Sequence, residues 1–121
     1  MHVVPVRSVA FRSIRLGRKR VEGRLKRGLF KHIQPDDVIM FTCHGSSFNA
    51  RVERVCEYDC FRDMLRTEGL RSVLPYGDVV HVQDGVRLYE SIYKHDDELM
   101  KRRALAGTLA DRVIGIKLIH A

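Results

Sequence analysis

The segment GRKRVEGR, which begins at position 17, places one carboxylate among closely spaced cations. Alternate side chains of an extended strand share a face, so Arg20, Glu22 and Arg24 are expected to lie together. The guanidinium groups would pair with the carboxylate, which would orient them in turn. Gly17 permits a turn that swings Lys19 toward the same cleft. The pattern predicts a mostly positive cleft with one carboxylate, which suits a phosphate together with a base edge or a sugar hydroxyl.

The same residues fit a second interpretation. Glu22 and Arg24 can form a structural ion pair that only braces a strand, since ion pairs of this kind also occur away from functional sites. The residue chemistry alone leaves both interpretations open.

The basic charge of the chain is local. The 121 residues carry a formal net charge of +7, and residues 12–31 alone hold nine Lys and Arg side chains against one acid, Glu22. A concentrated basic block is typical of proteins that bind a phosphate backbone, although a solvated basic face gives the same pattern. The residues predicted to contact nucleic acid are Arg15, Arg18, Lys19, Arg20, Glu22, Arg24, Lys26, Arg27 and Lys31.

The elements that position this segment are short strands and helices. Strands are expected over residues 1–6, 18–25, 38–43, 48–57 and 112–119, from β-branched residues and alternation. Helices are expected over 8–16 and 60–68, from about Asp84 onward, and over 96–103, where acids precede bases. Strands at both ends and in the middle, with helices between them, predict an α+β domain whose mixed sheet curls into a barrel.

Several classes of protein and site are not expected. With 45% hydrophobic and 31% charged residues, the composition is that of an ordinary globular protein. No apolar run is long enough for a membrane span and no secretory signal is visible, so we expect no membrane partner and an intracellular protein, cytoplasmic or nuclear. Cys43 and Cys56 should lie far apart on one hairpin, so no metal site and no cofactor are expected.

The four residues Gly17, Lys19, Glu22 and Arg24 resemble the GxKxxExR motif of the ASCH domain family, relatives of the PUA fold. The surrounding chain is similar too, with a basic loop over 27–34 that leads into a strand at 38–41. The later segments 51–55, 61–75 and 113–119 follow the order of strands and helices in that family. The resemblance covers nearly the whole chain, and it implies a single ASCH-like domain over residues 1–121, a small barrel of about five or six strands with short flanking helices.

The resemblance implies that the motif lines a ligand cleft and that the domain binds nucleic acid, with RNA the expected partner and single-stranded DNA an alternative. Some relatives are enzymes. A metal-independent ribonuclease would use Lys19 and Glu22 as catalytic residues, with a base to activate a 2′-hydroxyl and cations to stabilise the phosphorane. A nucleoside amidohydrolase is disfavoured, because its nucleophilic threonine is replaced by Glu22 here. Binding is preferred to cleavage, and a protein partner for the basic face stays open.

Overall fold

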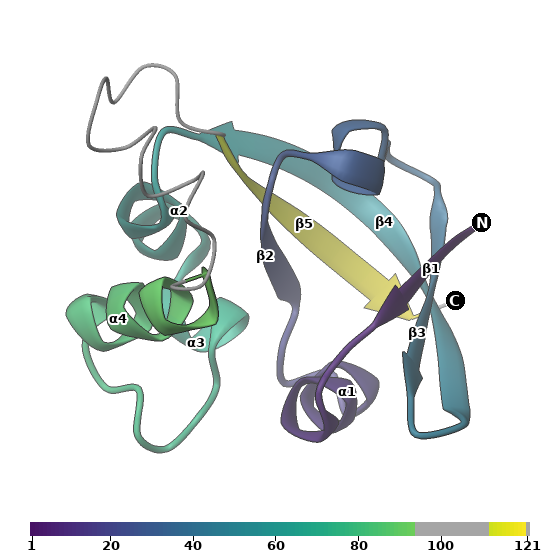
Figure 1. Cartoon of the computed structure of the whole chain (residues 1–121), viewed down its shortest axis with the longest axis horizontal. Coiled ribbons are helices and arrows are strands. Elements are labelled where there is room, and N and C mark those ends of the chain that lie inside the picture. Colours follow the sequence, from purple (N-terminus) through teal and green to yellow (C-terminus); the bar gives the residue numbers. More distant parts are fainter. Residues whose placement is uncertain (94–111, 121) are drawn as a thin grey trace.

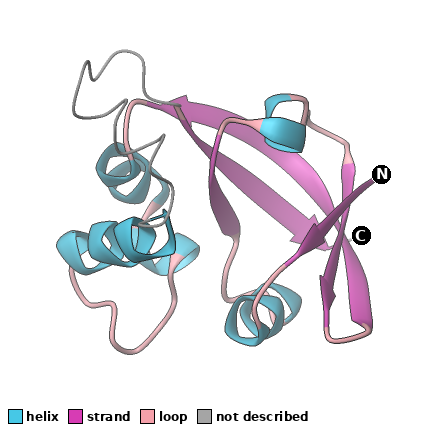
Figure 2. Ribbon diagram, viewed as in Figure 1, coloured by secondary structure: helices cyan, strands magenta, loops and turns pink. Residues whose placement is uncertain are grey.

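The structure, a computed structural model, describes residues 1–93 and 112–120. A five-stranded sheet in the order β1-β3-β4-β5-β2 forms its frame, with helices around it (Figures 1 and 2). The strands are β1 (His2–Pro5), β2 (Val21–Leu25), β3 (Val38–Cys43), β4 (Ser46–Tyr58) and β5 (Val113–His120). The helices are α1 (Ser8–Arg15), α2 (Phe61–Glu68), α3 (Leu70–Val73) and α4 (Val82–Tyr93), with a 3₁₀ turn, η1 (Gly28–Lys31).

The sheet is mixed. β1 pairs in parallel with β3, and the other neighbouring strands are antiparallel. The β3–β4 hairpin turns at His44 and Gly45, whose φ angles of 47° and 83° are those of a tight turn that continues the twist of the strands. The register of β4 against β5 shifts between Val52 and Arg54, and such an irregularity bends a strand. The long β4 can therefore pair with β3 at one end and with β5 along most of its length.

The predicted α+β architecture is confirmed, and the sheet curls as a half-barrel. In the described residues, β1 pairs only with β3 and β2 only with β5, so these two edge strands do not close the barrel. The candidate site described below lies at this opening. The helix expected over 96–103 falls outside the described residues.

Two groups of buried side chains hold the elements together. One lies between α2, α3, α4 and the strands β2 and β5, and includes Phe61, Met64 and Tyr89. The other fills the inside of the curl, where Phe11 and Ile14 of α1 pack against β3, β4 and β5. Strand β2 contributes Val21 and Leu25 to the first group. It thus packs against the helices while it pairs with β5 in the sheet.

The strand expected over 18–25 begins only at Val21, so the prediction was wrong for its first three residues. The backbone N–H groups of Arg18 and Lys19 both donate to the carbonyl of Ser13, 3.0 Å away. These bonds hold the chain against the end of α1, and the φ angle of Gly17, 75°, makes the turn. Strand alternation therefore does not reach back to Lys19.

Candidate functional site

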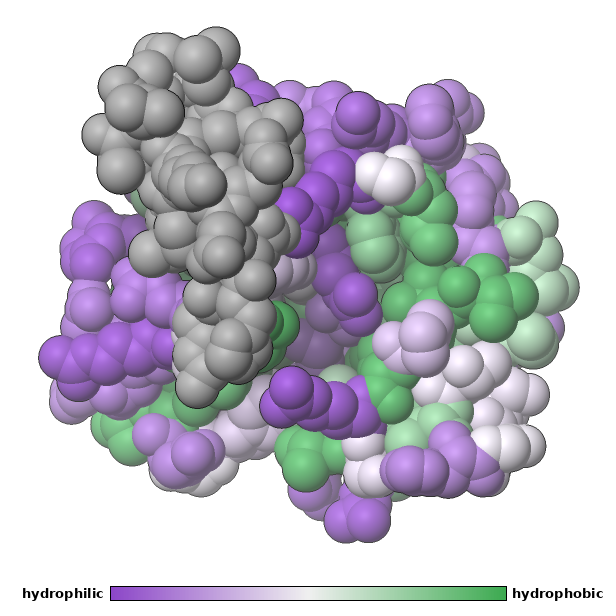
Figure 3. All heavy atoms as spheres, viewed as in Figure 1, coloured by the Kyte–Doolittle hydropathy of each residue, from purple (hydrophilic) through white to green (hydrophobic). Residues whose placement is uncertain are grey.

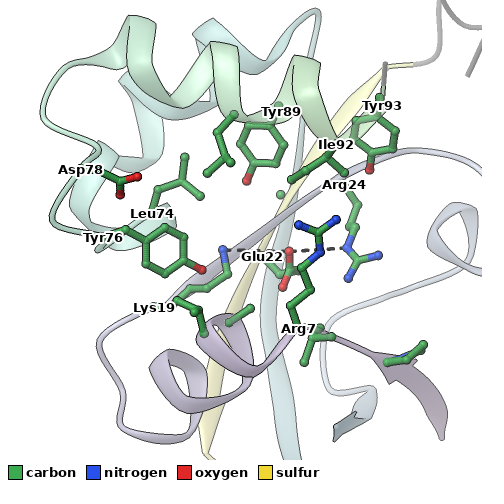
Figure 4. Close-up of a pocket in the computed structure, with 16 residues that line it drawn as sticks. Arg7, Lys19, Glu22, Arg24, Leu74, Tyr76, Asp78, Tyr89, Ile92 and Tyr93 are labelled. Atoms are coloured by element: carbon green, nitrogen blue, oxygen red, sulfur yellow. Dashed lines mark ion pairs between the residues drawn. The ribbon is translucent and has the colours of Figure 1, made fainter. Parts of the chain in front are cut away.

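A cavity of about 490 Å³ opens between the two edge strands of the sheet (Figure 4). Strand β2 contributes three consecutive residues to its lining, Glu22, Gly23 and Arg24. The segment from β1 into α1 borders one side, and residues of α4 and of the chain just before it border the other. Hydrophilic residues occupy the recessed middle of this face of the molecule, with hydrophobic patches beside them (Figure 3). The volume falls within the usual range for small-molecule sites.

Three charged side chains of the motif meet in this cavity. Glu22 Oε1 lies 3.5 Å from Nε of Arg24 and 4.0 Å from Nζ of Lys19. Lys19 is 3% exposed and Glu22 6%, whereas Arg24 is partly open to solvent. The structure thus brings together the three charged motif residues that the sequence placed in one cleft.

Lys19 is held in an unusual setting for a cation. Its Nζ donates a hydrogen bond to the carbonyl of Val73, which follows α2 in the short helix α3. Burial lowers the pKa of Lys19 from its ordinary value, and the nearby carboxylate of Glu22 opposes this shift. The guanidinium of Arg24 adds a smaller lowering effect. Lys19 is therefore a cation whose charge is weakly supported by the folded protein.

Two buried polar atoms at the cavity have no hydrogen-bond partner among the described residues. They are Oε2 of Glu22 and the hydroxyl oxygen of Tyr89. Tyr89 is 4% exposed, and burial, followed by the charge of Glu22, raises its pKa well above the ordinary value. Its hydroxyl lies against Gly23, where an added Cβ would come within 2.5 Å of it. A buried polar atom left unpaired costs free energy, so both atoms need an explanation.

Tyrosine side chains form much of the wall. Tyr76, Tyr89 and Tyr93 all line the cavity, and their hydroxyls are visible around Glu22 in Figure 4. Burial, with a contribution from Glu22, raises the pKa of Tyr76 to about 12. The ring of Tyr89 stacks on Phe61 with centroids 4.0 Å apart and belongs to the first group of buried side chains. The hydroxyl of the same residue points into the cavity (Figure 4), which its position in the sequence does not indicate.

Arg7 is a second residue that the sequence did not single out. It stands between β1 and α1, and its side chain extends into the cavity toward Glu22 and Arg24 (Figure 4). No motif includes it, because only the curl of the sheet brings β1 next to β2. The cavity is therefore lined by two guanidinium groups, one buried lysine and two carboxylates, the buried Glu22 and the exposed Asp78.

The other predicted contact residues are spread over the surface. Arg15, Arg18 and Lys31 are exposed and do not line the cavity. Lys26 pairs with Glu57, and the guanidinium of Arg27 lies 5.6 Å from the ring centre of Tyr93. The basic segment thus does not form one continuous face.

Arg20 was predicted to pair with Glu22, and this is wrong. Its backbone N–H donates to Ser72 and its carbonyl accepts from Leu118, so it lies at the join between α3 and β5. Its side chain borders a second hollow of about 320 Å³, together with Lys117 and residues of α1 and β5. Glu22 pairs with Lys19 and Arg24 instead.

Neither a metal cluster nor a membrane helix is found in the described ranges 1–93 and 112–120. No group of three or more His, Cys, Asp or Glu side chains there is placed to hold a metal ion. No helix there is long and apolar enough to cross a membrane. The three cysteines, Cys43, Cys56 and Cys60, are free thiols.

Comparisons with known proteins place the chain by sequence and by structure. The family model of the ASCH domain matches residues 4–108. The crystal structure of hypothetical protein PH0355 is similar, with a TM-score of 0.79, 27% identity, and coverage of 98% of this chain and 97% of that one. The solution structure of protein PF0455 from Pyrococcus furiosus gives a TM-score of 0.71 and 29% identity, over 98% and 96% of the two chains.

A mutant of ZmASCH from Zymomonas mobilis is similar in fold, with a TM-score of 0.61 and 14% identity, over 97% of this chain and 66% of that one. No curated protein matches the chain.

Proposed function

The chain belongs to the ASCH domain family, a group of PUA-like domains that generally bind RNA, and from this premise we propose that it binds RNA through the cavity around Lys19, Glu22 and Arg24. A phosphate group of the RNA pairs with the guanidinium groups of Arg7 and Arg24, which reach the cavity from opposite edges of the sheet. A sugar or base of the same nucleotide enters the cavity beside Glu22.

The observation that carries the proposal is the composition of the cavity. It combines two guanidinium groups, a buried carboxylate and several tyrosine side chains in a volume of about 490 Å³. Guanidinium groups recognise phosphate in two-point contacts, and aromatic rings stack on bases, so together they suit one nucleotide of a single strand. A purely structural ion pair would need no cavity beside it.

The neighbouring surface supports the path of a strand. Arg12, Arg15 and Arg18 are exposed on α1 and just after it, and α1 borders the cavity through Val9 and Ala10. None of these three arginines forms an ion pair with a described residue, so their charges are available to a phosphate backbone. Binding through such contacts weakens as the salt concentration rises. Binding releases counterions from the RNA, and this release is less favourable when the salt concentration is high.

Cleavage of the bound RNA at the same cavity is the second candidate. The observation that favours it is the unpaired Oε2 of Glu22, which could accept the proton of a 2′-hydroxyl. Lys19 and Arg24 beside it would stabilise the negative charge that develops on the phosphate.

The test uses end-labelled single-stranded RNA, run in parallel on native and denaturing gels with wild type and the Arg24→Ala variant. We expect a shift on the native gel with intact RNA on the denaturing gel, and at least a tenfold weaker shift for Arg24→Ala, the loss of one charge-assisted contact. Fragments that vanish in Glu22→Gln would favour cleavage instead.

Arg66→Ala is the matched control, since it removes an exposed arginine on α2 that does not line the cavity. It should bind RNA within about twofold of wild type at the same salt concentration. Equal losses in Arg24→Ala and Arg66→Ala would reduce the binding to general attraction by positive charge and would overturn the proposed site.

A further inference from the structure

The two unpaired atoms of the cavity differ from the rest of its lining. Glu22 and Tyr89 are more than nine-tenths buried, yet Oε2 of the one and the hydroxyl of the other lack a hydrogen-bond partner among the described residues. The other carboxylate oxygen, Oε1, already faces Lys19 and Arg24. Each side chain therefore offers one unused position to whatever occupies the cavity.

The absence of a side chain at Gly23 leaves space for the Tyr89 hydroxyl beside β2. The hydroxyl reaches strand β2 only because Gly23 has no side chain, since a Cβ there would lie 2.5 Å from the oxygen. One face of the Tyr89 ring is taken by Phe61, whose plane is inclined by 7°. Stacking on that face is closed to a ligand, whereas the hydroxyl has no hydrogen-bond partner among the described residues.

From these contacts we infer that Glu22 and Tyr89 together read the edge of a nucleobase, and that Tyr89 is a specificity-determining residue outside the motif. Oε2 of Glu22 accepts a hydrogen bond from an N–H group of the base, and the hydroxyl of Tyr89 donates to a neighbouring acceptor on the same edge. The inference rests on the proposed function for its choice of a nucleotide as ligand.

The charges of the cavity support separate roles, in which the arginines bind a phosphate and Glu22 and Tyr89 bind a base. A phosphate or carboxylate group is repelled by Glu22 and is attracted instead to Arg7 and Arg24. An apolar ligand would leave both buried atoms unpaired, which costs free energy. A planar ring with an N–H donor beside an acceptor satisfies both atoms, and the exposed part of the Tyr76 ring offers an aromatic surface near it.

Tyr89→Phe tests the inference, because it removes one oxygen and leaves the stacked ring in place. Fluorescence anisotropy would compare a mixed-sequence RNA strand containing all four bases with an abasic strand of equal length. We expect wild type to prefer the strand with bases, and Tyr89→Phe to lower that preference about threefold to tenfold, as one lost hydrogen bond does. Affinity for the abasic strand should be the same in both proteins.

Tyr58→Phe is the matched control, since it removes a hydroxyl that donates to Glu68 and does not line the cavity. It should lower the Tm and leave both affinities unchanged. Tyr89→Phe should keep or raise the Tm, because the hydroxyl that it removes has no hydrogen-bond partner among the residues that the structure describes. A purely structural role for Tyr89 would lower its Tm as Tyr58→Phe does.

The outcomes separate this inference from the proposed function. If wild type binds both strands equally, or Tyr89→Phe weakens both equally, base reading is refuted while RNA binding stands. If wild type binds neither strand, the proposed function fails, and saturation-transfer NMR with the four free nucleosides decides the inference alone. Nucleoside binding that requires the Tyr89 hydroxyl would then support it, and no nucleoside binding would overturn it.

Discussion

Two buried glutamates lie on either side of the β2–β5 pair, and the protein treats them in opposite ways. Glu68, whose side chain is 1% exposed, accepts two hydrogen bonds from Arg54 at 2.7 and 2.9 Å and a third from the hydroxyl of Tyr58. Glu22 has one oxygen beside two cations, and its other oxygen has no hydrogen-bond partner within the described ranges. The protein itself supplies hydrogen bonds to both oxygens of Glu68, whereas one oxygen of Glu22 has no hydrogen-bond partner in the described part of the chain.

The surroundings of the two carboxylates repeat this contrast. Burial disfavours the ionised form of Glu68, but the hydrogen bonds from Arg54 and Tyr58 outweigh it and lower the pKa of that carboxyl. The cation buried beside Glu22 is Lys19, and its pKa is lowered by desolvation. The protein thus supplies hydrogen bonds to both oxygens of the Glu68 carboxylate. Incomplete pairing around Glu22 therefore supports the proposal that a ligand completes this site.

The largest expected difference is in stability, and a matched pair of substitutions measures it. Glu68→Gln should lower the free energy of unfolding by about 2–3 kcal/mol, because its amide cannot accept the donors of both Arg54 and Tyr58. The value stays moderate because Arg54 is 43% exposed and its charge can be rehydrated. Glu22→Gln should cost about 1 kcal/mol, since Oε2 loses no bond and the amide oxygen can still face Lys19 and Arg24, although the charge beside Lys19 is lost. Urea unfolding of both variants gives the comparison.

RNA affinity should change in the reverse order, with Glu22→Gln weakened and the folded Glu68→Gln protein close to wild type. Equal destabilisation by the two substitutions would make Glu22–Arg24 a structural ion pair, the alternative that the sequence alone left open.

A second, smaller effect is expected at the glycines that face these two regions. Gly23 and Gly115 are opposite each other in the β2–β5 register. An added Cβ at Gly23 would lie 2.5 Å from the Tyr89 hydroxyl and 2.6 Å from Met64, whereas at Gly115 the nearest atom is Oε2 of Glu68 at 3.2 Å. Gly23→Ala should therefore cost about 1–3 kcal/mol of stability, and Gly115→Ala less than about 1 kcal/mol.

Gly23→Ala should also reduce the preference for RNA with bases, because it displaces the Tyr89 hydroxyl. Thermal unfolding and anisotropy on the two alanine variants check both parts. If Gly23→Ala is as stable as wild type, α4 can move away from β2 at little cost. The close contact between Gly23 and the Tyr89 hydroxyl would then not support the inference.

The sequence predicted much of the fold because local pattern and tertiary structure agree there. The apolar strand over 38–43 and the closing strand near the C-terminus follow from residue types that favour strands. The start of β2 was misjudged, because two backbone bonds to Ser13 hold Arg18 and Lys19 against α1. The alternation of residues within a strand does not predict hydrogen bonds to the preceding helix.

The site was predictable only in its contiguous part. Lys19, Glu22 and Arg24 lie within six residues, so one motif contains them all. Arg7 and Tyr89 reach the same cavity through the curl of the sheet and the packing of α4, and nothing near them in sequence indicates this.

The smallest effect expected is a pH dependence that distinguishes the two regions by sign. The pKa of Lys19 is lower in the folded protein than its ordinary value of 10.5, so between these two values the unfolded chain binds a proton that the folded chain does not. Lys19 therefore costs stability at neutral pH, and this cost is relieved as the pH rises toward 10.5. The lowered pKa of Glu68 acts at the acidic end of the pH range. Its stabilisation is present above the ordinary value of 4.5 and is lost as the pH falls through the lowered value.

The stability of wild type relative to Lys19→Met should rise with pH in the alkaline window. Taking this difference cancels the contribution of the tyrosines, which titrate in both proteins. Urea unfolding of the two proteins at several pH values from about 8 to about 10 measures it. A stability difference that does not change with pH would mean that the folded protein stabilises the Lys19 charge as well as it stabilises the Glu68 charge. The contrast between the two carboxylates would then rest on hydrogen bonds alone.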